Sequence, residues 1–323
     1  TLLSGLVTRP NQATQSTSLV SHPQLSLLLS EAFTVYLDNH RNGKDKNFAN
    51  SSLTHWNKLI DFLGDTTVHT VTREDARKYR DHRLASGLAP SSVAREINAI
   101  RAIFTKAIRE LSLNIPNQFA GIEVFDSNRN LNDRLPYTSV EIALLVRESL
   151  KIDDEQRRIV IALAFTGARL AEVVGLRKQD LDLKNSSIHI VAHNGRRLKN
   201  HQSAREIPLL PCAFDALRRQ SEDAAGDFIF PSYTHEKKCN ADSASATLNK
   251  WAKKFVPNRT MHCFRHALRD QLRAVNCPES IAKELGGWSN ARDISAQYGQ
   301  GHPLHLKRQF IEQAYGSTLL NLI

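Results

Sequence analysis

Residues 23–125 contain four successive segments in which apolar residues recur every three or four positions, and this repetition constrains the fold more than any other feature of the chain. Such spacing places the apolar side chains on one face of an α-helix. Helices of this kind, joined by short connections, bury their apolar faces against one another. The pattern therefore predicts an all-α domain, with helices that begin after Pro23 and over residues 51–63, 74–86 and 91–111.

A polar, asparagine-rich stretch at residues 126–136 has the composition of an interdomain linker. Within residues 137–316, an apolar stretch predicts a helix over 158–176, and alternating segments at 187–191 and 205–210 predict a small antiparallel sheet. The expected fold class is mainly α with a small antiparallel β-sheet, as an all-α domain followed by an α+β domain. A polar leader at residues 1–22 and an apolar C-terminal tail at 317–323 flank the two domains.

The chain is basic, with 43 Lys and Arg residues against 33 Asp and Glu residues and a formal net charge of +10. This surplus suits a partner that carries many phosphates, although a basic soluble protein would show it too. The four cysteines form no C-x-x-C pair, so the sequence encodes neither a disulfide framework nor a thiolate zinc site. No apolar run is long enough to span a bilayer and no signal peptide is recognisable, so a cytoplasmic protein is expected.

The segment Thr166 to Leu176, reading T-G-A-R-L-A-E-V-V-G-L, places Arg169 and Glu172 three residues apart in apolar surroundings. A buried arginine needs a partner, and the carboxylate supplies only part of it. The guanidinium is a planar donor fork that matches phosphate oxygens, so the pair indicates either an aimed phosphate ligand or a structural ion pair.

The segment His262-Cys263-Phe264-Arg265-His266 gathers His262, Arg265 and His266 on one side of an expected helix. Two histidines four residues apart also occur as zinc ligands. The arginine between them, and the absence of a glutamate beside His262, argue against a metal. No metal is therefore expected.

Two further motifs follow, L-G-G-W-S-N with Trp288 and Q-Y-G with Tyr298. The order and separation of all these motifs resemble those of the tyrosine recombinase, or phage integrase, family. The resemblance covers residues 135–315, and a looser one over 23–125 corresponds to the family's core-binding domain. By this resemblance, residues 137–316 form the catalytic domain.

The resemblance implies roles for individual residues. Arg169 and Arg265 would clamp the phosphate, His262 would assist, and Tyr298 would be the nucleophile. Trp288 stands where many members of the family have histidine. A hairpin lysine is expected at Lys199, in a basic turn that also contains Asn194, Arg196 and Arg197. Glu172 would orient Arg169, and His266 would support the helix or pack within it. Tyr315 is a rival nucleophile, but it lies too far beyond Trp288 for the family's spacing.

The implied activity is site-specific recombination through a 3′-phosphotyrosyl intermediate and a Holliday junction, without a cofactor. The implied partners are duplex DNA with specific recombination sites, three further copies in a homotetramer on that DNA, and accessory DNA-bending proteins. Without DNA the chain would be a monomer or a weak oligomer, in the cytoplasm of a bacterium and associated with the nucleoid. The alternatives are a non-catalytic DNA-binding relative, and an enzyme like type IB topoisomerases or telomere resolvases.

Basic residues are dense in the third and fourth expected helices, where they would face DNA phosphates. For any one of these side chains, a solvated helix face is the simpler interpretation. The candidate DNA-binding residues are Arg77, Arg80, Arg95 and Arg101, in a group that also includes Arg73, Lys78, Arg83, Lys106 and Arg109.

Overall fold

A computed structural model describes residues 26–125, 135–198, 203–235, 238–288 and 301–321, with side chains of the last segment described as far as residue 316. The chain divides into two compact units, Thr1–Arg129 and Asn130–Ile323, here called the N-terminal and C-terminal units. The described residues are mostly helical with a small antiparallel sheet, which confirms the expected fold class. Among them, no helix is both long and apolar enough to cross a membrane.

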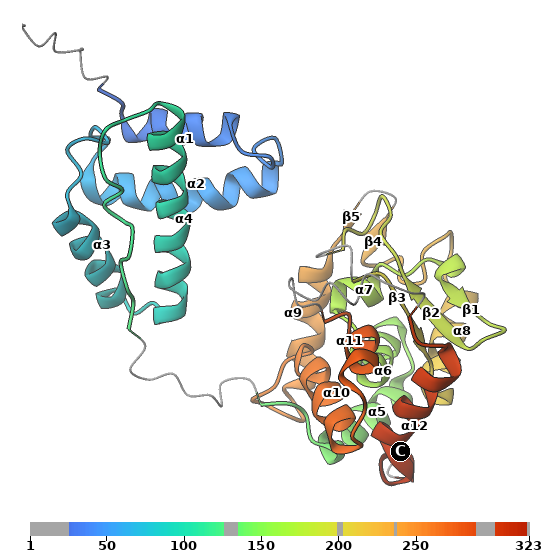
Figure 1. Cartoon of the computed structure of the whole chain (residues 1–323). Helices are drawn as coiled ribbons and strands as arrows, with labels where there is room; N and C mark the ends of the chain where they lie inside the picture. Colours follow the sequence, from blue (N-terminus) through green and yellow to red (C-terminus); the bar gives the residue numbers. More distant parts are fainter. Residues whose placement is uncertain (1–25, 126–134, 199–202, 236–237, 289–300, 322–323) are drawn as a thin grey trace, which may run out of the picture. The chain divides into compact units, whose positions relative to one another are not determined.

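The N-terminal unit is the expected set of helices, coloured blue to teal in Figure 1. Asp45 caps α2 by accepting bonds from two backbone N–H groups, which starts the helix earlier than its apolar periodicity indicates. Thr72 and Asp75 form the capping box of α3. Trp56 and Phe104 meet edge to face in the core. The helices are α1 (Leu29–Asp38), α2 (Lys46–Leu63), α3 (Arg73–Ala85) and α4 (Pro90–Glu110).

A buried carboxylate ties three of these helices together. Glu96 on α4 is 2% exposed and accepts hydrogen bonds from Tyr79 (2.6 Å), Lys58 (3.0 Å) and Arg83 (2.7 Å). Burial opposes ionisation of Glu96, but the bonds from Arg83, Tyr79 and Lys58 outweigh it and lower its pKa to about 2. Arg83 is therefore an internal partner and not part of an outward basic face.

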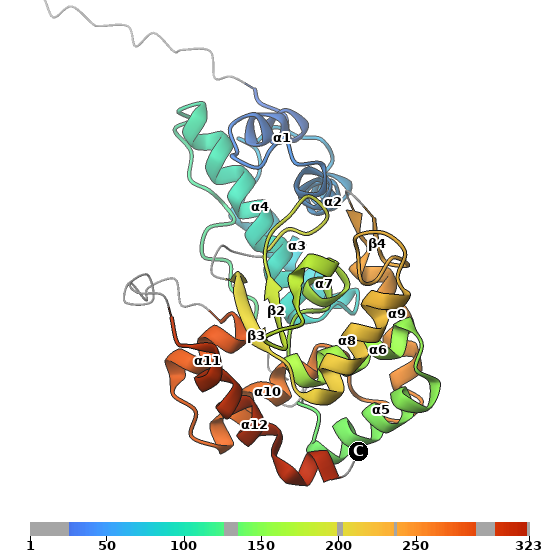
Figure 2. The ribbon, with the colours of Figure 1, turned by 90° about the vertical axis from the view of Figure 1, so that its right-hand side faces the viewer.

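The C-terminal unit contains a sheet in the order β1-β2-β3 and eight α-helices among its described residues. Figure 2 shows β2 and β3 side by side, and they pair antiparallel with His189 opposite Glu206 and Ile190 opposite Arg205. A two-stranded hairpin, β4-β5, was not expected from the sequence. The elements are α5 (Ser139–Ile152), α6 (Glu155–Thr166), α7 (Leu170–Val174), the 3-10 helix η1 (Lys178–Asp180), β1 (Leu181–Asp182), β2 (Ser187–Ile190), β3 (Arg205–Pro208), α8 (Pro211–Asp223), β4 (Thr234–His235), β5 (Lys238–Cys239), α9 (Ala241–Ala252), α10 (Cys263–Ala274), α11 (Glu279–Gly286) and α12 (Leu304–Asn321, kinked at Gly316).

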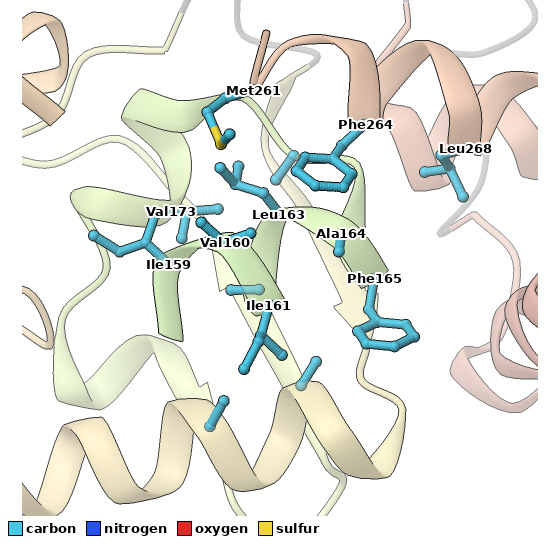
Figure 3. Packing of buried hydrophobic residues seen from close by; sticks show 14 of the residues in the cluster. Ile159, Val160, Ile161, Leu163, Ala164, Phe165, Val173, Met261, Phe264 and Leu268 are labelled. Atoms are coloured by element: carbon cyan, nitrogen blue, oxygen red, sulfur yellow. The ribbon is translucent and has the colours of Figure 1, made fainter. Parts of the chain in front are cut away.

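Helix α6 is the centre of this unit, because every residue from Arg158 to Thr166 is buried. A helix that is apolar on all sides belongs in a core. Helices α5, α8 and α10 pack around it. Figure 3 shows Leu163 and Phe165 of α6 together with Phe264 and Leu268 of α10.

Gly167 ends α6, so the helix expected over 158–176 is interrupted there. Its φ is +55°, and a Cβ at this position would lie 2.5 Å from Leu268 Cδ2. Only glycine combines this left-handed backbone with such a close approach of α10. The chain then turns into the short helix α7, and Arg169 precedes that helix instead of lying within a continuous one.

We expect Gly167→Ala to lower the free energy of unfolding of the C-terminal unit by about 1–3 kcal/mol more than Gly226→Ala does. Gly226 is the matched control, because its φ of +77° is also positive but a Cβ there would meet nothing within 4 Å. Urea-dependent hydrogen exchange of α6 peptides measures both losses. Equal losses would mean that the contact with Leu268 relaxes without cost.

Candidate active site

The turn between α6 and α7 presents Arg169 in a fixed direction. Its Nη1 donates to Glu172 Oε1 at 2.6 Å and to Ser203 Oγ at 3.1 Å. Its backbone N–H donates to Glu172 Oε2 at 2.9 Å. The same carboxylate therefore holds both ends of Arg169.

Glu172 is buried at 3% exposure and has a second cationic partner, Arg205, the first residue of β3. Arg205 Nη2 lies 2.8 Å from Glu172 Oε2, and both side chains are 4% exposed. Burial would raise the pKa of Glu172, but the charge and hydrogen bond of Arg205, together with the contacts of Arg169, lower it to about 2. The carboxylate is therefore ionised at neutral pH.

Arg265 lies on the first turn of α10 and is 5% exposed. Its Nη1 donates to the carbonyl of Gly167 at 3.1 Å, and its Nη2 is buried without a hydrogen-bond partner among the residues that the structure describes. Burial, followed by the nearby charges of Arg169 and Arg205, lowers the pKa of Arg265 to about 9. At neutral pH the guanidinium remains charged, and an anion beside it would satisfy the unpaired donor.

Trp288 packs against two arginines of α10. Its ring centroid lies 4.9 Å from Arg265 Cζ and 5.0 Å from Arg269 Cζ, within the range of cation–π contacts. Arg269 is held by Glu279, whose two carboxylate oxygens accept at 2.7 and 2.6 Å. A Cβ at Gly286 would lie 2.2 Å from Cε3 of the Trp288 indole. The ring can therefore occupy its position only because residue 286 has no side chain.

These side chains line one open pocket of about 430 Å³. Its lining contains three arginines, one lysine and one glutamate, and this excess of positive charge suits an anion. His262 is exposed at the start of α10, and its ring centroid lies 5.1 Å from that of His266. The residues that line the pocket are Arg169, His262, Arg265, His266, Arg269, Glu279, Lys283 and Trp288.

The structure thus brings together Arg169, His262, Arg265 and Trp288, with Glu172 behind Arg169. Lys199 and Tyr298 lie outside the described residues. Tyr315, the rival tyrosine, is 2% exposed, and its hydroxyl donates to the carbonyl of Ala164 at 2.5 Å. Burial raises the pKa of this phenol, so Tyr315 is unsuited to attack a phosphate.

Three arginines bind acceptors within their own unit and are not part of an exposed basic surface. Arg196, expected in a basic turn, is 2% exposed and donates to the carbonyls of Glu172 (2.7 Å) and Val191 (2.6 Å). Arg73 donates to the backbone carbonyls of Gln118 and Gly121, and so closes the end of the N-terminal unit. Like Arg83, the side chains of Arg196 and Arg73 stabilise the fold. Other basic residues must therefore bind any anionic ligand.

The four candidate DNA-binding residues have different environments. Arg77 and Arg95 are exposed. Arg80 is paired with Asp81 at 2.8 Å and also donates to the carbonyl of Glu123. Arg101 lines a pocket of about 300 Å³ between α1 and α4 that also contains His40, Lys106 and Arg109.

One group of side chains among the described residues has the composition of a metal site. Ligand atoms of Asp182, His189 and Glu206 lie within 4.8 Å of one another on the β1-β2-β3 sheet. Asp182 already accepts bonds from Lys184 and Asn185 of its own turn, and Glu206 accepts from Ser187. None of the three lines the pocket described above.

Comparison with known proteins shows the family to which this chain belongs. A model of the phage integrase family matches residues 138–303, and a model of the phage integrase N-terminal domain matches residues 27–125. Together they cover most of the chain, which therefore belongs to the phage integrase family.

Individual relatives agree with this assignment. Tyrosine recombinase XerA of Pyrococcus furiosus is 23% identical over 91% of this chain and 95% of the relative. The Tn1549 transposon integrase in complex with circular intermediate DNA has a similar fold, with a TM-score of 0.67 at 18% identity over 88% of this chain and 99% of that one. A lambda integrase tetramer bound to a Holliday junction gives a TM-score of 0.63 at 16% identity, over 86% of this chain and 80% of that one.

The protein is a tyrosine recombinase, an enzyme that cleaves and rejoins DNA in site-specific recombination. The family resemblance found in the sequence motifs is confirmed. Neither alternative expected from the sequence, a non-catalytic relative or a topoisomerase, receives support from these matches.

Proposed function

We propose that Arg169 and Arg265 clamp the nonbridging oxygens of the scissile phosphate, and that Tyr298 attacks its phosphorus. The observation that carries this proposal is the buried Nη2 of Arg265, which has no hydrogen-bond partner in the described part of the chain and lies in a pocket that Arg265 shares with Arg169. An unpaired buried donor costs about 1–3 kcal/mol, and a phosphate oxygen would remove that cost. Because arginine stays charged, both residues neutralise the phosphate without any protonation step.

In the proposed step, the phenol of Tyr298 loses its proton and its oxygen forms a bond to phosphorus. The bond between phosphorus and the 5′ oxygen breaks, and that oxygen takes up a proton. The products are a 3′-phosphotyrosine and a free 5′ hydroxyl. Negative charge grows on the phosphate oxygens in the five-coordinate transition state, where donors fixed in place stabilise it most.

Four further residues complete the proposal. His262, exposed in the pocket, accepts the phenol proton or braces the phosphate. Lys199 protonates the leaving 5′ oxygen. Trp288, which is anchored against Arg265, packs beside the reacting tyrosine and offers its indole N–H. His266 supports the helix from within the same pocket.

The proposed partner is duplex DNA that carries specific recombination sites, with four copies of the chain assembled on two duplexes at a Holliday junction. The rejoining step reverses the cleavage, since a 5′ hydroxyl from the partner duplex attacks the phosphotyrosine and displaces the phenol. Accessory DNA-bending proteins and contacts from Arg77, Arg80, Arg95 and Arg101 to DNA phosphates belong to the same proposal.

A suicide substrate tests the nucleophile and the mechanism together. A nicked duplex that contains the cognate attachment site is incubated with the wild type and with Tyr298→Phe in the presence of EDTA. We expect a covalent protein–DNA band on a denaturing gel for the wild type and none for the variant. A band of undiminished intensity from Tyr298→Phe would refute the assignment, as would tight binding by the wild type without any band.

A further inference from the structure

Arg205 lies behind the pocket and is not among the described side chains that line it. Its guanidinium nevertheless contacts Glu172 and Leu285 on two other segments of the site, and also Ser203, which lies two residues before Arg205 in the chain. We propose that Arg205 is a positioning residue for DNA cleavage, which fixes Glu172 and the turn before Trp288 relative to the start of β3. This inference rests on the proposed function, in which Arg169 clamps the scissile phosphate.

Each nitrogen of Arg205 has a different acceptor. Nη2 donates to Glu172 Oε2 at 2.8 Å, Nη1 donates to the carbonyl of Ser203 at 2.8 Å, and Nε donates to the carbonyl of Leu285 at 2.9 Å. Arginine has five donors in a rigid planar fork, so three bonds in three directions fix the relative positions of the segments. The contacts are internal, because the side chain is only 4% exposed.

The turn between α11 and Trp288 is shaped around this guanidinium. Gly287 has a φ of +59°, and a Cβ there would lie 2.8 Å from Arg205 Nη1. Leu285, whose carbonyl accepts from Arg205, lies in the last turn of α11, just before the two glycines that precede Trp288. Arg205 therefore sets where the chain leaves α11 and, through that exit, where the indole meets Arg265.

The effect of Arg205 on Arg169 passes through Glu172 and Ser203. Arg169 Nη1 donates to both Glu172 Oε1 and Ser203 Oγ, while Arg205 binds the other oxygen of that carboxylate and the carbonyl of that serine. The charged groups that face Glu172 are Arg169, Arg205 and Arg265, and Arg196 donates to its backbone carbonyl. Without Arg205, Arg169 is the one cation among the described residues that remains bonded to the buried carboxylate.

The test measures two quantities separately for each variant: the Kd for a duplex with the attachment site, and the rate of covalent complex formation at saturating protein. For Arg205→Met we expect the rate to fall about tenfold to a hundredfold with little change in the Kd, as for residues that orient a primary ligand. Arg205→Lys keeps one charge beside Glu172 but loses the three-way fork, so we expect an intermediate rate.

The pH dependence separates positioning from a purely structural effect. In Arg205→Met, the buried Glu172 loses one of the two cations that lower its pKa and should take up a proton more readily, so the rate should fall more steeply with falling pH than in the wild type. In the double variant Arg205→Met/Glu172→Gln this extra slope should disappear. The two substitutions should also be less than additive in the logarithm of the rate, because they remove parts of one unit.

Arg158→Met is the control, since Arg158 is a buried arginine of the same unit whose acceptors, among them Asp153 and Gln220, lie away from the pocket. A wild-type rate in Arg205→Met, strict additivity with Glu172→Gln, or an equal loss in Arg158→Met would each overturn the proposal. The covalent band of the wild type tests the proposed function itself, so failure of the clamp is distinguishable from failure of the Arg205 inference.

Discussion

Replacing Arg265 with Met is expected to lower the rate of covalent complex formation by at least about a hundredfold, the usual effect of removing one preorganised donor to a transition-state oxyanion. The same substitution should leave the stability of the C-terminal unit unchanged or increased. The rate and the stability respond differently because the positive charge that binds the phosphate lowers the stability of the protein without DNA.

The cost in the free protein follows from the surroundings of Arg265. The side chain is buried, one nitrogen has no hydrogen-bond partner within the described ranges, and Arg169 and Arg205 are neighbouring like charges. Methionine has a similar length and buries no donor, so it removes the desolvation and the repulsion together. The lost contact with the Trp288 ring and the lost hydrogen bond to the carbonyl of Gly167 offset part of this gain.

Arg158→Met provides the reverse case within the same unit. Arg158 Nε lies 3.1 Å from Asp153 and its Nη1 lies 2.5 Å from Asp223, so its loss breaks a satisfied network. We expect that variant to lose about 1 kcal/mol or more of stability and to keep its cleavage rate. Thermal unfolding and the suicide-substrate assay, run on both variants, test whether Arg265→Met loses cleavage rate and keeps its stability while Arg158→Met does the reverse. A large loss of stability in Arg265→Met would show that the guanidinium is a structural tie.

The helices were predictable because each buries one face, and apolar periodicity records that face directly. The centre of α6 was predictable for the same reason, since it is apolar on every side. Its end at Gly167 was not, because the requirement for glycine comes from Leu268 of α10, about a hundred residues away in the chain. Periodicity carries no information about such an approach.

Within the site, the motifs identified Arg169, His262, Arg265 and Trp288, which the structure places around one pocket. Arg205 was missed, although the sequence contains a signal. It alternates with Ile207 and Leu209, both buried, so it lies on the inner face of the strand, where an arginine requires acceptors. The two distant acceptors, Glu172 and the carbonyl of Leu285, could be identified only from the fold.

In the N-terminal unit, the sequence identified the basic residues but not which of them are exposed. Arg73, Arg77 and Arg83 lie on one helix and look equivalent in sequence, yet only Arg77 is exposed. Arg83 pairs with Glu96, and Arg73 binds backbone carbonyls near residue 120. A basic helix therefore does not reveal which of its cations remain for DNA, because that depends on partners outside the helix.

Glu172→Ala is expected to lower the free energy of unfolding of the C-terminal unit by about 3–5 kcal/mol at neutral pH, the cost of leaving buried charge without its partner. Removal of this carboxylate leaves Arg169, Arg205 and Arg265 facing one another. Glu222→Ala is the control, because Glu222 is 60% exposed in its 2.8 Å pair with Arg218. An exposed pair of this kind contributes about 0–1 kcal/mol.

The pH dependence of this loss follows from the lowered pKa of Glu172. A carboxyl with a folded pKa near 2 and an ordinary value of 4.5 stabilises the fold fully above pH 4.5, and this contribution declines as the pH falls towards 2. The difference between wild type and Glu172→Ala should therefore be constant from neutral pH down to about pH 5 and narrow below it. Urea-dependent hydrogen exchange of α6 peptides at neutral and acid pH measures that difference. A gap that stays constant into acid would mean that Glu172 acts through its shape and not its charge, and Arg169 would then owe its direction to Ser203 alone.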